Sequence, residues 1–178
     1  LIVTHYYPDP DCLASALGMA HLLRHFNIVN SLITFGGFVG RAENRALIRF
    51  VGINTVPLML VDTTEYDRII LVDCYPEVGN LSLSKEITVD AVFDHHPHPP
   101  CNNQLVFCEL RKDLGATSTL ITQYLRASEV EINAELATAL FYGIKTDTND
   151  MARFSSHEDL ECYKLLFDLM DHRLLSKI

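Results

Sequence analysis

The sequence has no run of apolar residues long enough for a transmembrane helix, which needs roughly 18 or more. It also lacks a signal peptide, with its basic start and apolar core. We therefore expect a cytoplasmic protein with no membrane partner. Its 178 residues are enough for one domain with a sizeable core. Because the chain opens on "LIVTH" without a methionine, we expect it to be a piece of a longer protein.

The cysteines form no recognisable framework, and basic residues are outnumbered by acidic ones. The five cysteines are odd in number and form no C-x-x-C pair, which argues against a disulfide framework and a structural zinc site. We expect free thiols in a reducing compartment. The 14 basic and 23 acidic residues give a net charge of −9, which argues against binding of long duplex nucleic acid. A small phosphorylated substrate is still compatible with this charge if metal ions reverse it locally.

Apolar segments typical of strands alternate along the chain with segments of helical periodicity. The predicted strands cover 1–5, 29–37, 68–73 and 89–94, and the predicted helices cover 11–26, 40–52, 115–126, 133–148 and 157–175. This alternation predicts an α/β fold with a parallel, Rossmann-like twisted sheet and helices on both faces. In such folds ligands bind at the carboxyl ends of the strands.

Polar residues of the kinds that bind metals stand where the predicted strands end. His5, Asp73 and Asp94 each end a strand. Asp9 and Asp11 follow His5 closely and repel each other when both are ionised, so cations beside them would explain why only Pro10 separates them. Three strand ends with polar ligands at one edge of a sheet favour a metal centre there.

Most of these residues, though not His5, also have a purely structural explanation, as does Asp147. Asp9 or Asp11 could cap the helix that follows, because aspartate is a favoured N-cap. Asp73 could be a turn residue, Asp147 could end its helix, and "DHHPHPP" at 94–100 could be a solvated loop. None of these explanations accounts for the whole set, so we favour the metal centre.

Four short segments carry a resemblance to a known family. They are "HYYPDPD" at 5–11, Asp73 at a strand end, "DHH" at 94–96 and "GIKTDT" at 143–148. In this order they resemble the four motifs of the DHH phosphoesterase family. The chain is most similar to the branch with nanoRNase and 3′-phosphoadenosine-5′-phosphate phosphatase activity, and family II inorganic pyrophosphatases share the same metal layout.

The resemblance implies two divalent metal ions, with manganese expected and magnesium or cobalt as alternatives. One ion would be held by His5, Asp9 and Asp73. The other would be held by four residues, of which Asp73 is shared: Asp11, Asp73, His95 and Asp147. Asp94 and His96 would form the catalytic pair, with Asp94 steadying a histidine and His96 facing the substrate phosphate.

The function implied is metal-dependent hydrolysis of phosphate esters of small nucleotides or short oligonucleotides, with a hydroxide activated by two ions roughly 3.5–4 Å apart. Two alternatives remain open. One is an inorganic pyrophosphatase or exopolyphosphatase, and the other is a non-catalytic nucleotide-sensing module of a larger regulatory protein. Phosphodiesterases of the family usually carry a second domain with a glycine-rich histidine motif. No such motif occurs here, so we expect residues 1–178 to be the DHH domain, without the C-terminal substrate-binding domain.

Substrate contacts and assembly are less well defined by the sequence. Arg41 and Arg45 fall four residues apart on a predicted helix beside the turn "GGFVG" and could steer a phosphodiester toward the metals. A solvated helix face, with Glu43 nearby, is the alternative explanation. The segment "GATST" at 115–119 could lie near the site or could be a simple helix start. A homodimer is a further expectation.

Overall fold

The computed structural model describes residues 1–76, 79–81, 83–84, 86–98 and 105–178. Its centre is one sheet of six parallel strands in the order β3-β2-β1-β4-β5-β6. The strands are β1 (Ile2–Tyr6), β2 (Ile33–Gly36), β3 (Thr55–Pro57), β4 (Ile70–Val72), β5 (Ala91–Asp94) and β6 (Phe107–Leu110). The direction of winding reverses between β1 and β4, which is where ligands bind in sheets of this type.

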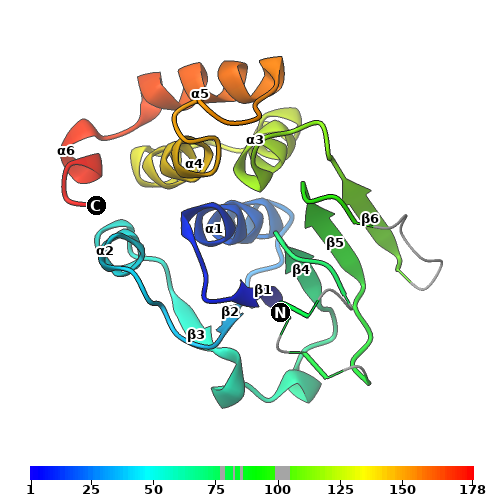
Figure 1. Cartoon of the computed structure of the whole chain (residues 1–178). Helices are drawn as coiled ribbons and strands as arrows, with labels where there is room; N and C mark the ends of the chain where they lie inside the picture. Colours follow the sequence, from blue (N-terminus) through cyan, green and yellow to red (C-terminus); the bar gives the residue numbers. More distant parts are fainter. Residues whose placement is uncertain (77–78, 82, 85, 99–104) are drawn as a thin grey trace.

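The α-helices lie in layers over one face of the sheet. They are α1 (Pro10–His25), α2 (Ala42–Val51), α3 (Thr117–Ala127), α4 (Ala134–Asp147), α5 (His157–Leu169) and α6 (His172–Leu175). Figure 1 shows α1 against the sheet, α3 and α4 next, and α5 outermost. On the second face, the helical elements of the described residues are two short 3-10 helices, η1 (Leu58–Leu60) and η2 (Thr63–Glu65). The α/β class and the parallel sheet are confirmed. The predicted helices on both faces are found as α-helices on one face, whereas the described residues of the second face form only these two 3-10 helices.

Alternation of side chains along the strands supplies the core on both faces. Ile2 of β1 packs into the cluster beneath α1, whereas its neighbour Val3 packs into the cluster on the opposite face with Leu71 and Leu58. All four side chains are buried. The central strands are therefore apolar on both faces, which holds their carboxyl ends in fixed positions.

Local signals explain where α1 begins. Asp9 is its N-cap and accepts a hydrogen bond of 3.0 Å from the backbone N–H of Cys12, while Pro10 occupies the first helical position. The capping explanation therefore holds for Asp9. Asp11 is the second residue of the helix and is 1% exposed, and the N-cap position is already taken by Asp9, so capping of α1 does not explain it.

Three elements differ from the sequence predictions. Strands β3 and β6, at the two edges of the sheet, were not predicted, and they have only three and four residues. The predicted helix 157–175 is two helices, because Met170 takes an extended conformation and Asp171 caps a new start through the N–H groups of Arg173 and Leu174.

The cysteines match the prediction of free thiols only in part. Cys12, Cys74 and Cys162 are free and buried. Cys108 is disulfide-bonded, so the prediction is wrong for that residue, and Cys101 lies outside the described residues. Within the described ranges, no helix is both long enough and apolar enough to cross a membrane.

Candidate metal centre

The residues predicted to bind metal lie at the carboxyl edge of the sheet. His5 is near the end of β1, Asp73 directly follows β4, and Asp94 and His95 are at the end of β5. Asp147, the last residue of α4, completes this edge. The fold thus brings together residues that are far apart in the sequence.

The first group consists of His5, Asp9 and Asp73. Nε2 of His5 lies 3.7 Å from Oδ1 of Asp9 and 3.5 Å from Oδ2 of Asp73. The thiol of Cys12 also lies within this group. Burial raises the pKa of Cys12 to about 12, so it stays a neutral thiol and is a poor metal ligand.

The second group surrounds Nε2 of His95. This nitrogen lies 3.1 Å from Oδ2 of Asp147, 3.7 Å from Oδ1 of Asp73 and 4.0 Å from Oδ2 of Asp11. Asp73 therefore presents one carboxylate oxygen to each group, Oδ2 toward His5 and Oδ1 toward His95. A carboxylate placed in this way can bridge two cations.

Both histidines are oriented by backbone carbonyl groups. Nδ1 of His5 lies 2.8 Å from the carbonyl oxygen of Tyr6, and Nδ1 of His95 lies 3.2 Å from that of Leu114. Because a carbonyl only accepts, each Nδ1 carries a hydrogen and each Nε2 points at the carboxylates. Nε2 of His95 is buried and has no hydrogen-bond partner among the described residues. A proton or a metal ion is needed between this nitrogen and the oxygens around it.

The pKa values of the clustered carboxyl and imidazole groups are shifted in the directions expected of a site that binds cations. Burial, Asp73 and Asp147 together raise the pKa of Asp11 well above its usual range, and burial also raises the pKa of Asp73. Burial alone would lower the pKa of His95, but Asp147, Asp73 and Asp11 raise it to about 10. Divalent cations would neutralise these carboxylates without protons, and a mixed imidazole and carboxylate set suits metals such as manganese.

The N-terminus of α3 holds Asp11 in place. The backbone N–H of Thr117 donates to Oδ2 of Asp11 over 2.7 Å, and that of Ser118 donates to Oδ1 over 2.8 Å. The N-cap residue of α3, Ala116, has no capping side chain, so Asp11 takes that role from α1. The segment "GATST" therefore does lie at the site.

The hydroxyl of Thr117 and the glycine at 143 also shape the site, and no pattern in the sequence marks the role of either. Oγ1 of Thr117 donates to Oδ1 of Asp73 over 2.7 Å. Gly143 of α4 passes so close to α1 and α3 that a Cβ there would lie 2.3 Å from Oγ of Ser118 and 3.2 Å from Cα of Asp11. The glycine in "GIKTDT" thus lets α4 bring Asp147 to the site.

The predicted catalytic pair is in direct contact. Oδ1 of Asp94 lies 2.8 Å from Nδ1 of His96 and also accepts the backbone N–H of His96 over 3.1 Å. Asp94 is fully buried, whereas the side chain of His96 is 43% exposed. The hydrogen bond to Asp94 raises the pKa of His96 and so favours the imidazolium form, in which the second ring nitrogen also carries a hydrogen to donate.

The two arginines make no contact with the site among the described residues. Arg41 is the exposed N-cap of α2 rather than a residue of the helix face. The guanidinium of Arg45 donates to the carbonyl oxygens of Gly40 and Val39. Their role in binding substrate stays a prediction.

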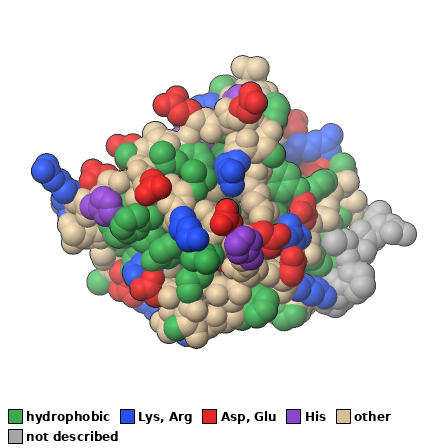
Figure 2. All heavy atoms as spheres, turned by 90° about the horizontal axis from the view of Figure 1, so that it is seen from above, with side chains coloured by type: hydrophobic (Ala, Val, Ile, Leu, Met, Phe, Trp, Pro, Cys, Tyr) green, Lys and Arg blue, Asp and Glu red, His purple; other side chains and the backbone are tan. Residues whose placement is uncertain are grey.

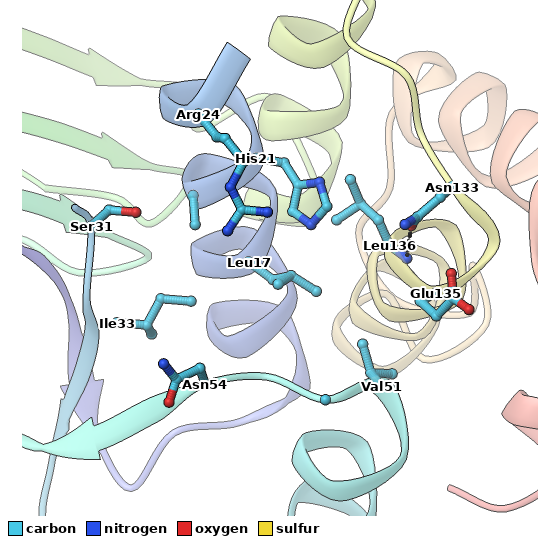
Figure 3. A pocket seen from close by; sticks show the side chains of 12 residues that line it. Leu17, His21, Arg24, Ser31, Ile33, Val51, Asn54, Asn133, Glu135 and Leu136 are labelled. Carbon is cyan, nitrogen blue, oxygen red and sulfur yellow. Dashed lines mark hydrogen bonds between the residues drawn. The ribbon is translucent and has the colours of Figure 1, made fainter. Parts of the chain in front are cut away.

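A cavity of about 350 Å³ lies at the amino ends of strands β2 and β3, away from the carboxyl ends that carry the predicted site. Figure 3 shows side chains from the second half of α1, from the end of α2 and from the start of α4 around it, among them His21, Arg24 and Asn133. None of the predicted site residues lines this cavity. It is therefore separate from the metal-binding groups.

Comparison with protein families matches residues 1–144 to the DHH family, N-terminal domain. Among curated proteins, an uncharacterised protein of Methanocaldococcus jannaschii is 34% identical over 183 residues, which is all of this chain and 36% of that protein. An A-adding tRNA nucleotidyltransferase of Geobacter sulfurreducens is 26% identical over 85% of this chain and 17% of its own length. A probable manganese-dependent inorganic pyrophosphatase of Enterococcus faecalis is 23% identical over 98% of this chain and 56% of its own length.

Among solved structures, a family II inorganic pyrophosphatase, described as putative, from Methanococcus jannaschii superposes with a TM-score of 0.77. It is 22% identical, and the match covers 94% of this chain and 54% of that one. The fold is therefore shared. The chain spans between about a sixth and about a half of the length of these relatives.

Proposed function

The chain belongs to the DHH family, and on this basis we propose that it is a hydrolase of phosphate esters or phosphoanhydrides that works with two divalent metal ions. The observation that carries the proposal is the position of Asp73. One oxygen of its buried carboxylate faces His5 and the other faces His95. A structural role alone would not call for a carboxylate between two imidazoles and three further carboxyl groups.

The residues present fit such ions. His5, Asp9 and Asp73 would hold one, and Asp11, His95 and Asp147 would hold the other together with Asp73. Manganese is the proposed metal, since the relatives from Enterococcus and other bacteria are named manganese-dependent, with magnesium or cobalt as alternatives. When bound, the ions would activate water as a nucleophile and offset negative charge on the phosphoryl group.

The chain's own residues would act on the substrate from the open side of the site. His96 donates one N–H to Asp94 and is half exposed, so its other N–H can donate to a phosphoryl oxygen as negative charge develops there. Asp94 orients this imidazole and favours its charged form. Thr117 keeps Asp73 in the orientation that serves both groups.

A cluster of exposed aromatic rings supports nucleotides as the substrates. Tyr6 and Tyr7 directly follow His5, and the ring of Tyr7 lies 5.1 Å from that of Phe38 in an edge-on contact. Tyr7 has a left-handed backbone (φ 57°), and its ring packs so close to Gly37 that a Cβ there would lie 2.8 Å away. Tyr7 and Phe38 are 58% and 64% exposed. Rings of this kind stack on nucleobases for about 1–3 kcal/mol per base.

The second candidate is cleavage of a phosphoanhydride, as in pyrophosphate or polyphosphate. It is favoured by the names of the bacterial relatives and of the superposed structure. Such a substrate has no base, so the aromatic cluster would have no role in binding it.

Long duplex nucleic acid is an unsuitable partner on charge grounds. The net charge is −9, and on the face shown in Figure 2 the basic side chains lie singly among acidic ones. We propose a small phosphorylated substrate, with further contacts from parts of a longer protein. A homodimer is part of the same proposal.

The test is hydrolysis by the full-length protein loaded with manganese. The panel would contain pyrophosphate, 3′-phosphoadenosine 5′-phosphate, a dinucleotide and a cyclic dinucleotide. Asp73→Asn should abolish turnover of every substrate and reduce bound manganese, whereas Asp168→Asn, at an exposed carboxyl group on α5, should change neither. Bound manganese without turnover of any substrate would instead support the sensing module.

A second comparison separates the two substrate classes. Tyr7→Ala should raise KM for the dinucleotide about tenfold, the equivalent of 1.4 kcal/mol of lost stacking, and should leave pyrophosphate unaffected. The control is Phe26→Ala, because Phe26 is also 58% exposed but lies at the other end of α1. Equal effects on both substrates would argue against a base-stacking role.

A further inference from the structure

We propose that His98, which none of the roles above includes, is a positioning residue that fixes Asp94 and through it the imidazole of His96. The inference rests on the proposed function, because it concerns the group that would contact the phosphate. It arises from the hydrogen bonds of one buried carboxylate at the end of β5.

The two oxygens of Asp94 are held by two different histidines. Oδ1 pairs with Nδ1 of His96 at 2.8 Å, and Oδ2 pairs with Nε2 of His98 at 2.7 Å. Held through Oδ1 alone, the carboxylate could rotate about its Cβ–Cγ bond and carry the His96 ring with it. The second hydrogen bond, from His98, removes this freedom.

His98 is itself held firmly. Its side chain is 8% exposed, and its ring stacks on that of Tyr75, with ring centroids 5.0 Å apart and an angle of 20° between the planes. Tyr75 is buried and lies two residues after Asp73. The stack therefore ties the end of β5 to the end of β4, so His96 is positioned relative to the carboxylate that faces both metal groups. A solvated loop, the alternative considered for 94–100, does not describe His98.

Asp94, His96 and His98 also lie close enough together to hold an ion, but their contacts argue against a metal there. Both carboxylate oxygens pair directly with imidazole nitrogens at hydrogen-bond distances, so protons occupy the positions that an ion would need. His98 therefore acts through Asp94, and we expect it to affect turnover rather than metal binding.

The kinetic test compares three substitutions of His98 in the manganese-loaded full-length protein. His98→Ala should lower kcat about tenfold or more, the usual effect of losing a group that orients an active-site residue. KM and the affinity for manganese should stay close to those of the wild type, because His98 contacts Asp94 and Tyr75 rather than a residue of the two metal groups. His98→Gln retains an amide donor near the position of Nε2 and should recover most of kcat. His98→Asn, one methylene shorter, should not.

The matched control is His157→Ala. His157 also pairs with a carboxylate four residues away, Glu161 at 3.7 Å, but it is 81% exposed on α5. Its loss should leave kcat unchanged. A loss of manganese affinity as large as the loss of kcat in His98→Ala would overturn the proposal, because His98 would then support the metal groups. Equal activity of the Gln and Asn variants would also overturn it.

A second readout needs neither metal nor turnover. Nitrogen-15 NMR of the side chains should give one sharp, slowly exchanging Nδ1–H signal for His96 in the wild-type protein, and an exchange-broadened one in His98→Ala. An unchanged signal would overturn the proposal. If no substrate is hydrolysed by the wild-type protein, the proposed function fails, while this spectrum still decides the role of His98. If His98→Ala does not fold, the Gln and Asn variants decide it.

Discussion

The hydroxyl of Thr117 donates a 2.7 Å hydrogen bond to Oδ1 of Asp73, the oxygen that faces His95. Thr117 is fully buried, and its backbone N–H is already used by Asp11. A single residue at the start of α3 therefore orients two carboxylates of the metal-binding groups.

Replacement of Thr117 by valine should weaken metal binding without unfolding the protein. Valine keeps the shape but leaves Oδ1 of Asp73 without its donor, and loss of such a partner typically weakens metal binding ~10–100-fold. Calorimetric titration with manganese measures the effect. Thr117→Ser should restore affinity. Thr122→Val, which removes a buried hydroxyl from the same helix, should leave affinity unchanged. Equal losses in the two valine variants would contradict this role.

The adjacent histidines His95 and His96 should separate into different roles. His95→Ala removes the nitrogen that faces Asp11, Asp73 and Asp147, so manganese affinity should fall and excess manganese should partly restore activity. His96→Ala should keep both ions but lose on the order of 10²–10³ in kcat, as expected for a donor to developing charge. Metal content and kcat at rising manganese concentrations distinguish the variants. Rescue of His96→Ala but not of His95→Ala would reverse the assignment.

Gly143 should tolerate no side chain. In Gly143→Ala the new Cβ would meet Oγ of Ser118 at 2.3 Å and Asp11 at 3.2 Å, which forces α4 away from α1 and α3. Overpacking of this kind typically costs about 1–3 kcal/mol of unfolding free energy. Urea denaturation measures it. Gly40→Ala is the control, because a Cβ there has only Cε2 of Phe38 near it, at 3.5 Å. Similar stability of the two variants would show that α4 can move away at little cost.

Manganese affinity should rise with pH. Without metal, Asp147, Asp73 and Asp11 raise the pKa of His95 to about 10, so its imidazole holds a proton near neutral pH that binding must displace. The raised pKa of Asp11 acts in the same direction. Each proton released makes affinity rise about tenfold per pH unit below these pKa values. Calorimetric titrations with manganese in two buffers of different ionisation enthalpy measure the number of protons released on binding. Binding to the His95→Asn variant should release one proton fewer. A manganese affinity that stays constant between pH 6 and 8 would contradict this prediction.

The parts of the fold that were predictable are those with strong local signals. The central strands are continuous apolar runs, and α1 and α4 carry both helical periodicity and capping residues, Asp9 and Asn133. His5, Asp73 and Asp94 could be placed at one edge because parallel strands share their carboxyl ends. Strands β3 and β6 are too short to carry such a pattern.

The parts that were missed depend on contacts between distant segments. Asp11 caps α3 by accepting from backbone N–H groups more than a hundred residues away, and no side-chain pattern marks a backbone donor. Asp159 is similar. Its capping box with Ser156 is readable in the sequence, but its hydrogen bonds to the N–H of Gly115 and the hydroxyl of Thr119 are not.

Asp147 at the end of α4 lies 3.1 Å from His95, so the metal-binding groups are complete only when most of the domain has been synthesised and folded. During translation, a cation can find its full set of ligands only after residue 147 has left the ribosome. Once bound, it favours the folded state by mass action, by about 2.7 kcal/mol at a hundred times its Kd. The midpoint of thermal unfolding should therefore rise with manganese concentration. In a cell short of the metal, we therefore expect a smaller fraction of this protein to be folded.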